Sequence, residues 1–145
     1  MREEPINSVV PNSNPSSHRV LVVDDDKIVC ITLARVFETN GYEVRHAHCA
    51  EEALELLADW APHLAIVDVN LLKMNGVELA RRIRARDPHC RMLLFSGRPE
   101  STELVQQAAS EGYTFELVAK PIHPGHLLEW AREGRLPGGA GSSLS

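Results

Sequence analysis

The chain has 145 residues, enough for one folded domain with a sizeable core, because single domains commonly run about 100 to 150 residues. Its 20 Asp and Glu residues outnumber its 15 Lys and Arg residues, and the formal net charge of −5 disfavours nucleic acid or an anionic membrane as the main partner. The three cysteines form no CxxC pair, so neither a disulfide framework nor a cysteine-rich zinc site is expected. These features favour a reducing, cytoplasmic setting and cationic ligands.

The two ends of the chain differ in composition from the region between them. Residues 1–18 are rich in Pro, Asn and Ser and lack the apolar core of a signal peptide, and residues 134–145 are rich in Gly and Ser. We therefore expect a disordered N-terminal tail, a domain over residues 19–133 and a flexible C-terminal tail. No apolar run approaches the roughly 20 residues that span a bilayer, so we expect a soluble protein without membrane insertion.

Between the tails, short apolar runs alternate with segments of helical period. This alternation predicts an α/β domain, a doubly wound sheet of five parallel strands with five helices on its two faces. The fifth helix is a short one near residues 124–133. We predict strands at residues 20–23, 43–47, 64–67, 92–95 and 115–119.

Polar side chains follow four of the predicted strands directly, and in a parallel sheet such positions border the ligand crevice. They are Asp24 and Asp25 after the first strand, Asp68 after the third, Ser96 and Gly97 after the fourth, and Lys120 after the fifth. Each alone has an ordinary explanation, such as a helix cap, a turn or a solvated charge, but their joint placement is improbable by chance. Two carboxylates about 4 Å apart repel by roughly 1 kcal/mol even in water. Because Mg²⁺ prefers carboxylate oxygens, the cluster predicts a magnesium site.

Four segments in this order resemble the receiver domain of bacterial two-component response regulators: VLVVDDD, LAIVDVNLLKMNG, MLLFSG and LVAKPI. The resemblance covers about residues 20–133. It implies a flavodoxin-like fold with strand order 2-1-3-4-5. The strand order therefore comes from the family and not from the spacing of the apolar runs.

The resemblance also implies roles for the residues at the strand ends. Asp68 would be the nucleophile that takes a phosphoryl group from a phosphohistidine. Mg²⁺ or Mn²⁺ would be held by four groups: the carboxylates of Asp24, Asp25 and Asp68 and the backbone carbonyl of Asn70. The chain would be a phosphoacceptor that assists its own phosphotransfer and autodephosphorylation, and not an enzyme with a separate substrate.

The remaining strand-end residues would contact the phosphoryl group. Lys120 would pair with one phosphoryl oxygen, the Ser96 hydroxyl would bond to another, and Gly97 would leave space for the group. The phosphodonor would be a sensor histidine kinase or a histidine phosphotransfer protein. A downstream protein would bind the face of the fourth helix, fifth strand and fifth helix, with no direct contact to nucleic acid.

The sequence departs from the family pattern at two positions. Leu72 stands four residues beyond Asp68, where the family usually has proline, and Leu117 stands three residues before Lys120, where an aromatic residue is common. Arg98 occupies a position at which the family tunes acyl-phosphate lifetime. In the family the peptide bond between Lys120 and Pro121 is commonly cis.

The sequence also allows two rival functions and contains a pair of histidines away from the strand-end residues. A pseudo-receiver would use the same fold as a protein-binding module without phosphate, although retention of all the strand-end residues disfavours it. A flavin or metabolic enzyme of similar fold would need a phosphate-binding loop after the first strand, which the sequence lacks. His46 and His48 fall on one side of a predicted strand, but the sequence indicates no third ligand, so we do not predict a zinc site there.

Overall fold

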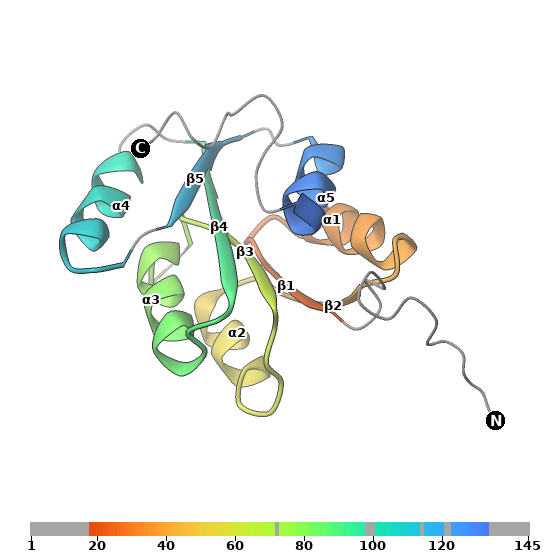
Figure 1. Cartoon of the computed structure of the whole chain (residues 1–145), viewed down its shortest axis with the longest axis horizontal. Coiled ribbons are helices and arrows are strands. Elements are labelled where there is room, and N and C mark those ends of the chain that lie inside the picture. Colours follow the sequence, from red (N-terminus) through yellow and green to blue (C-terminus); the bar gives the residue numbers. More distant parts are fainter. Residues whose placement is uncertain (1–17, 72, 98–100, 114, 121–122, 134–145) are drawn as a thin grey trace.

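The computed structural model describes residues 18–71, 73–97, 101–113, 115–120 and 123–133; the predicted tails lie almost wholly outside these ranges. Five strands alternate with five helices along the chain (Figure 1). Their bounds are β1 (Arg19–Val23), α1 (Lys27–Thr39), β2 (Glu43–Ala47), α2 (Ala50–Leu56), β3 (Leu64–Asp68), α3 (Gly76–Arg86), β4 (Arg91–Ser96), α4 (Ser101–Ser110), β5 (Glu116–Ala119) and α5 (Pro124–Glu133). The predicted bounds of the second strand and the last helix are confirmed, and those of the other strands shift by a residue.

The strands form one parallel sheet in the order β2-β1-β3-β4-β5, as the resemblance implies. Every residue of β3 is buried, as are the last four of β1, which explains why these runs are apolar almost throughout. β2 lies at an edge and is mostly exposed. The alternating period of the strands divides the core into two layers.

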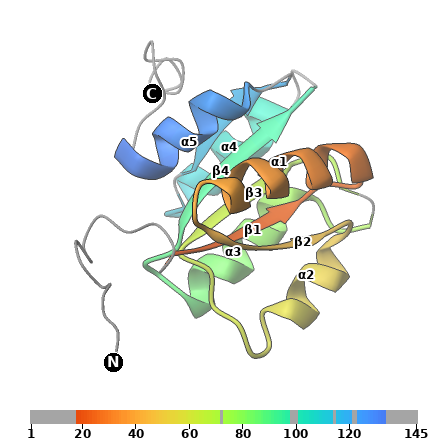
Figure 2. The same cartoon turned by 90° about the vertical axis from the view of Figure 1, so that its right-hand side faces the viewer.

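Helices α1 and α5 cover one face of the sheet, and α2, α3 and α4 cover the other (Figures 1 and 2). Val20 and Val22 point to the first face, where they join Phe37 and Trp130 in one apolar cluster. The intervening side chains point to the second face and pack with the other three helices. Within the part of the chain that the structure describes, no helix is long and apolar enough to cross a bilayer.

Local signals set the ends of the helices. Asp26 caps α1, because its side chain accepts hydrogen bonds from the backbone N–H groups of Ile28 and Val29. Gly41 and Gly112 follow α1 and α4 with φ angles of 94° and 99°, the left-handed conformation in which glycine commonly ends a helix. The cap at Asp26 begins α1 immediately after Asp24 and Asp25, so the first strand-end residues lie between β1 and α1.

Candidate functional site

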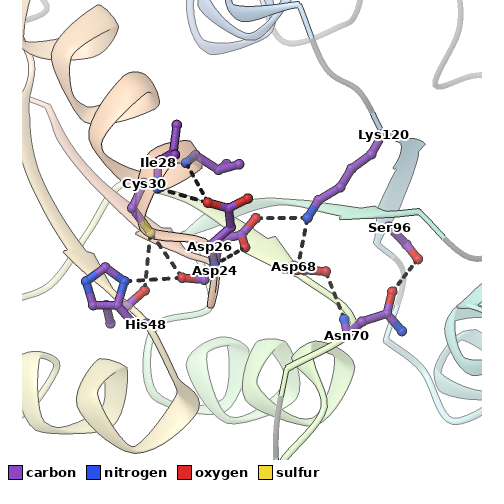
Figure 3. A network of polar contacts seen from close by, with 11 residues as sticks. Asp24, Asp26, Ile28, Cys30, His48, Asp68, Asn70, Ser96 and Lys120 are labelled. Atoms are coloured by element: carbon purple, nitrogen blue, oxygen red, sulfur yellow. Dashed lines mark hydrogen bonds and ion pairs between the residues drawn. The ribbon is translucent and has the colours of Figure 1, made fainter.

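The sheet brings the predicted strand-end residues together at its carboxyl edge (Figure 3). The register pairs Val23 with Val67 and Asp68 with Phe95, so β1, β3 and β4 end at nearly the same level. Residues that are 52 positions apart in sequence consequently come within hydrogen-bond distance. The convergence predicted from the apolar runs is therefore present.

Three carboxylates form the acidic part of the site. Asp24 is fully buried and Asp68 is 3% exposed, whereas Asp25 is exposed to solvent. One carboxylate oxygen from each lies within 4.8 Å of the others. Asp24 is held in place because its Oδ1 accepts a hydrogen bond of 2.8 Å from the backbone N–H of Asp26.

Lys120 bridges the two buried carboxylates. Its Nζ lies 3.0 Å from Asp24 Oδ2 and 3.1 Å from Asp68 Oδ2, and it also lies 4.9 Å from the centre of the Phe95 ring. A backbone hydrogen bond of 2.8 Å from Lys120 N to Ser96 O anchors the lysine to β4. One ammonium among three carboxylates leaves the site with an excess of negative charge.

Burial and the close ion pair shift the pKa values of both Asp24 and Lys120. Burial raises the pKa of the Asp24 carboxyl, and the backbone N–H of Asp26 and the Lys120 ammonium lower it only in part. For Lys120, burial alone would lower the pKa, but its close contacts with the carboxylates of Asp24 and Asp68 and the charges of these groups raise it above its ordinary value. Lys120 is therefore charged at neutral pH. Its single positive charge does not neutralise the three carboxylates of the site.

The donor set fits a hard divalent cation. Asp24 Oδ2 is buried and forms an ion pair with Lys120, yet it accepts no hydrogen bond of acceptable geometry from any described residue. A buried carboxylate oxygen without such a bond is costly unless a cation neutralises it. Carboxylate oxygens with room for water on the exposed Asp25 side are the ligands that Mg²⁺ takes.

Asn70 makes two contacts that the sequence did not predict. Its backbone N–H donates to Asp68 Oδ1 at 2.9 Å, and its side-chain Oδ1 accepts a hydrogen bond of 2.7 Å from Ser96 Oγ. The resemblance had implied only the backbone carbonyl of Asn70 as a ligand. Asn70 thus connects Ser96 to Asp68. In the sequence, this role could have been inferred only from the position of an amide side chain two residues after Asp68.

Gly76 is a second residue that sequence reasoning missed. It begins α3, and its N–H donates to the carbonyl of Val69 at 2.8 Å. A Cβ at this position would overlap the backbone carbonyl of Asp68, whereas a Cβ on Gly97 would meet open space. Gly76 therefore permits the close approach of α3 to the backbone of Asp68 at the end of β3. The role of Gly97 toward an incoming group stays a prediction.

Of the two positions at which the sequence departs from the family pattern, only Leu117 lies among the described residues. Leu117 is 8% exposed and packs in the core beside α3 and α4, so an aliphatic side chain fills the place of the usual aromatic residue. Leu72, Arg98 and Pro121 lie outside the described residues. The predictions for the loop, the acyl-phosphate lifetime and the cis peptide bond are therefore untested.

The fold and site define a doubly wound α/β domain with an acidic, lysine-bridged pocket at the carboxyl edge of its sheet. A family model for the response regulator receiver domain matches residues 20–132. The chain is 37% identical over 112 residues to the response regulator MprA of Mycobacterium ulcerans, a match that covers 77% of this chain. The chain therefore belongs to the response regulator receiver family of two-component signalling.

Solved structures agree with this assignment. A CheY-like receiver domain protein from Methanospirillum hungatei has a TM-score of 0.71 and 28% identity over 81% of this chain and 92% of its own. A response regulator from Burkholderia pseudomallei, solved with a phosphorylated aspartic acid, a calcium ion and citrate, also has a TM-score of 0.71, with 29% identity over 87% of this chain and 70% of its own. The chain spans about half the length of the mycobacterial relative, 47%.

Proposed function

We propose that this chain is a phosphoacceptor receiver of a two-component phosphorelay and that Asp68 carries the phosphoryl group. The phosphodonor is a sensor histidine kinase or a histidine phosphotransfer protein. The observation that carries the proposal is the arrangement around Asp68, a buried carboxylate at a strand end with an ammonium 3.1 Å away and two further acids beside it. The phosphoaspartate of the Burkholderia pseudomallei relative supports the same chemistry.

In the proposed reaction, a carboxylate oxygen of Asp68 attacks phosphorus on the phosphohistidine. An O–P bond forms, the N–P bond breaks, and the imidazole of the donor keeps the electron pair and takes up a proton. The backbone N–H of Asn70 orients the carboxylate through Oδ1. Because Asp68 is held from both sides, little reorganisation is needed before attack.

The other pocket residues accommodate the developing charge. Lys120 already contacts Asp68 Oδ2, so the oxygens of a phosphoryl group attached to Asp68 lie within its reach. The Ser96 hydroxyl would leave Asn70 Oδ1 and donate to another phosphoryl oxygen. Mg²⁺ or Mn²⁺, held by Asp24, Asp25, Asp68 and the backbone carbonyl of Asn70, would neutralise negative charge on the transferring oxygens. The same groups would assist hydrolysis of the acyl phosphate, so the chain would not be an enzyme with a separate substrate.

Phosphodonor and output partner would use different surfaces. On α1, Ile28 and Ile31 are 74% and 50% exposed, and Ile28 lines an open groove of about 470 Å³ together with Phe95 and Lys120. Exposed apolar side chains beside the acceptor suit a docking phosphodonor. Added charge on Asp68 would act on Ser96 and Lys120, and through them on the face of α4, β5 and α5, where the downstream protein binds.

Mass spectrometry after incubation with acetyl phosphate and Mg²⁺ tests this function. We expect one phosphoryl adduct on the wild-type chain and none on Asp68→Asn. Asp59→Asn, which removes an exposed carboxylate elsewhere, is the matched control and should keep the adduct. An adduct that persists in Asp68→Asn would assign the chemistry to another residue, and absence of any adduct would leave a phosphate-independent binding module.

A further inference from the structure

A second cluster of metal-ligating side chains lies outside the acidic pocket. It consists of Cys30 from α1, His46 from β2 and His48 just after β2, and one ligand atom from each lies within 4.8 Å of the others. The sequence showed the two histidines but no third ligand. The fold supplies that ligand from a helix, because Cys30 lies on the inward face of α1.

The packing of α1 on the sheet explains the proximity. Cys30 is fully buried, and its Sγ contacts the backbone oxygens of Asp24 at 3.2 Å and Ala47 at 3.6 Å. His46 pairs in register with Val22, whose side chain belongs to the same apolar cluster as Cys30. His48 follows two residues later, so both imidazoles project to the same face, and their ring centroids are 5.4 Å apart.

One ring nitrogen of His48 lies beside a backbone carbonyl. Its Nδ1 lies 3.4 Å from the backbone carbonyl of Asp24 (Figure 3). With the proton on Nδ1, that nitrogen donates to the carbonyl and Nε2 carries a free electron pair. Ligating histidines commonly have their second nitrogen fixed by such an oxygen. His48 is half-buried and His46 is exposed, so an ion can enter from solvent.

We propose that Cys30, His46 and His48 bind one borderline divalent metal ion of the Zn²⁺ class, with water completing the tetrahedron. One thiolate and two imidazoles are soft and borderline donors, which suit Zn²⁺ and Co²⁺ and not Mg²⁺. When the sulfur–metal bond forms, the Cys30 proton leaves to solvent, and no change of oxidation state is required. Before that step, burial raises the pKa of the Cys30 thiol to about 12, so it is a neutral donor to the Asp24 carbonyl.

The two clusters lie on opposite sides of Asp24. Figure 3 shows Cys30 and His48 on one side and Asp68 and Lys120 on the other. The acidic pocket offers only oxygen ligands, and the second cluster offers sulfur and nitrogen. Because the donor chemistry differs, the two sites should select different ions, and the second proposal does not depend on phosphorylation of Asp68.

Titration of the full chain with Co²⁺, followed by absorption, tests the site. We expect one equivalent to produce a thiolate-to-cobalt charge-transfer band together with the ligand-field bands of tetrahedral cobalt. Cys30→Ser should abolish the charge-transfer band, while Cys49→Ser, which removes the neighbouring half-buried thiol, should retain it. Absence of the band in the wild-type chain, or its loss only in Cys49→Ser, would overturn the proposal.

Two further variants guard against misfolding and against binding in the acidic pocket. His46→Ala alters an exposed side chain and should weaken Co²⁺ binding more than about tenfold, because loss of even an outer partner of a metal ligand typically costs about 10- to 100-fold. His89→Ala, at another exposed histidine, should leave the affinity unchanged. Asp25→Asn should keep the charge-transfer band, because cobalt held only by the carboxylates of the acidic pocket would give no such band. Loss of the band in that variant would show that the site depends on the acidic pocket and would overturn the proposal.

Discussion

The two ends of the sheet handle buried charge in opposite ways. At the carboxyl end, three acids face one ammonium, and Asp24 Oδ2 lacks a hydrogen bond of good geometry from the described residues. At the amino end, Arg91 donates to the backbone carbonyls of Trp130 at 2.6 Å and Ala131 at 3.1 Å. The Trp130 indole N–H in turn donates to Glu116 at 2.6 Å.

Within one sheet, the polar contacts at the amino end serve stability, whereas those at the carboxyl end form the candidate site. Polar groups that are fully bonded to one another, as at the amino end, fix helix α5 against β4 and β5 and add to the free energy of unfolding. Acids gathered without enough cations, as at the carboxyl end, cost stability but create a site for a cation and a phosphoryl group. The amino end should therefore tolerate substitution poorly, and the carboxyl end should become more stable when its charge is removed.

The largest effect is expected at the amino end. Trp130→Ala removes a side chain that is 1% exposed, stacks under Arg91 at 4.6 Å and bonds to Glu116, so we expect the free energy of unfolding to fall by about 3 to 5 kcal/mol. Urea denaturation measures this. The exposed neighbour Glu129→Ala should change stability by less than about 0.5 kcal/mol. Equal effects from both variants would break the contrast.

A smaller loss is expected from Gly76→Ala at the carboxyl end. The added Cβ would overlap the Asp68 backbone carbonyl, so α3 must shift, and such overpacking costs about 1 to 3 kcal/mol. Gly97→Ala is the matched control, because its Cβ meets open space, and its urea midpoint should stay near that of the wild type. A normal midpoint for Gly76→Ala would show that α3 is not held by this contact.

Removal of charge from the acidic pocket should stabilise the fold. Asp68→Asn removes one ion pair, with Lys120, and two charge repulsions, from Asp24 and Asp25, while the amide oxygen can still accept the hydrogen bond from the Asn70 N–H. The net gain is about 1 kcal/mol in metal-free buffer, close to one charge repulsion at this separation in water. Addition of Mg²⁺ should stabilise the wild type selectively and reduce the difference. A destabilised Asp68→Asn would mean that the Lys120 contact outweighs both repulsions.

The smallest effect concerns pH and the amino end. His63 Nδ1 accepts a 2.9 Å hydrogen bond from the backbone N–H of Arg19. Although the side chain is exposed, partial burial of its ring, followed by the charges of Arg19 and His18, lowers the pKa of His63, with Asp87 opposing. A lowered folded-state pKa gives stability that is complete above the ordinary value of about 6.5 and is lost as pH falls through the folded value.

Urea midpoints between pH 7.5 and 5 measure that pH effect. His63→Gln should flatten the fall in stability on acidification, since the variant has no imidazole to protonate. His89→Gln removes an exposed imidazole at the same end and serves as the control. An unchanged slope in His63→Gln would show that protonation of His63 does not affect folding.

The sequence predicted those features that depend on the period of the strands. Apolar runs ended at Asp24, Asp68, Ser96 and Lys120, and parallel strands necessarily bring such ends to one edge. The order of strands came from the family resemblance and was confirmed. The roles of these residues toward phosphate and metal remain proposals, although their positions are established.

Other features depend on side-chain packing between elements and were not predictable from the period. The approach of α1 to β2 places Cys30 beside His46 and His48, and no regular spacing links those three positions. The contact of Gly76 with Asp68 depends on the path of the chain between β3 and α3. Such contacts depend on tertiary geometry. The sequence determines that geometry, but no spacing pattern within a single sequence reveals it.

The hydrogen bonds from Arg91 to carbonyls in the last turn of α5 anchor one end of this helix. They fix that helix at the end remote from the pocket, about 15 Å from the other end for a helix of 10 residues. From that anchored end the helix extends to Pro124, four residues after Lys120. A displacement of Lys120 would therefore reach the start of α5 before the end that Arg91 holds.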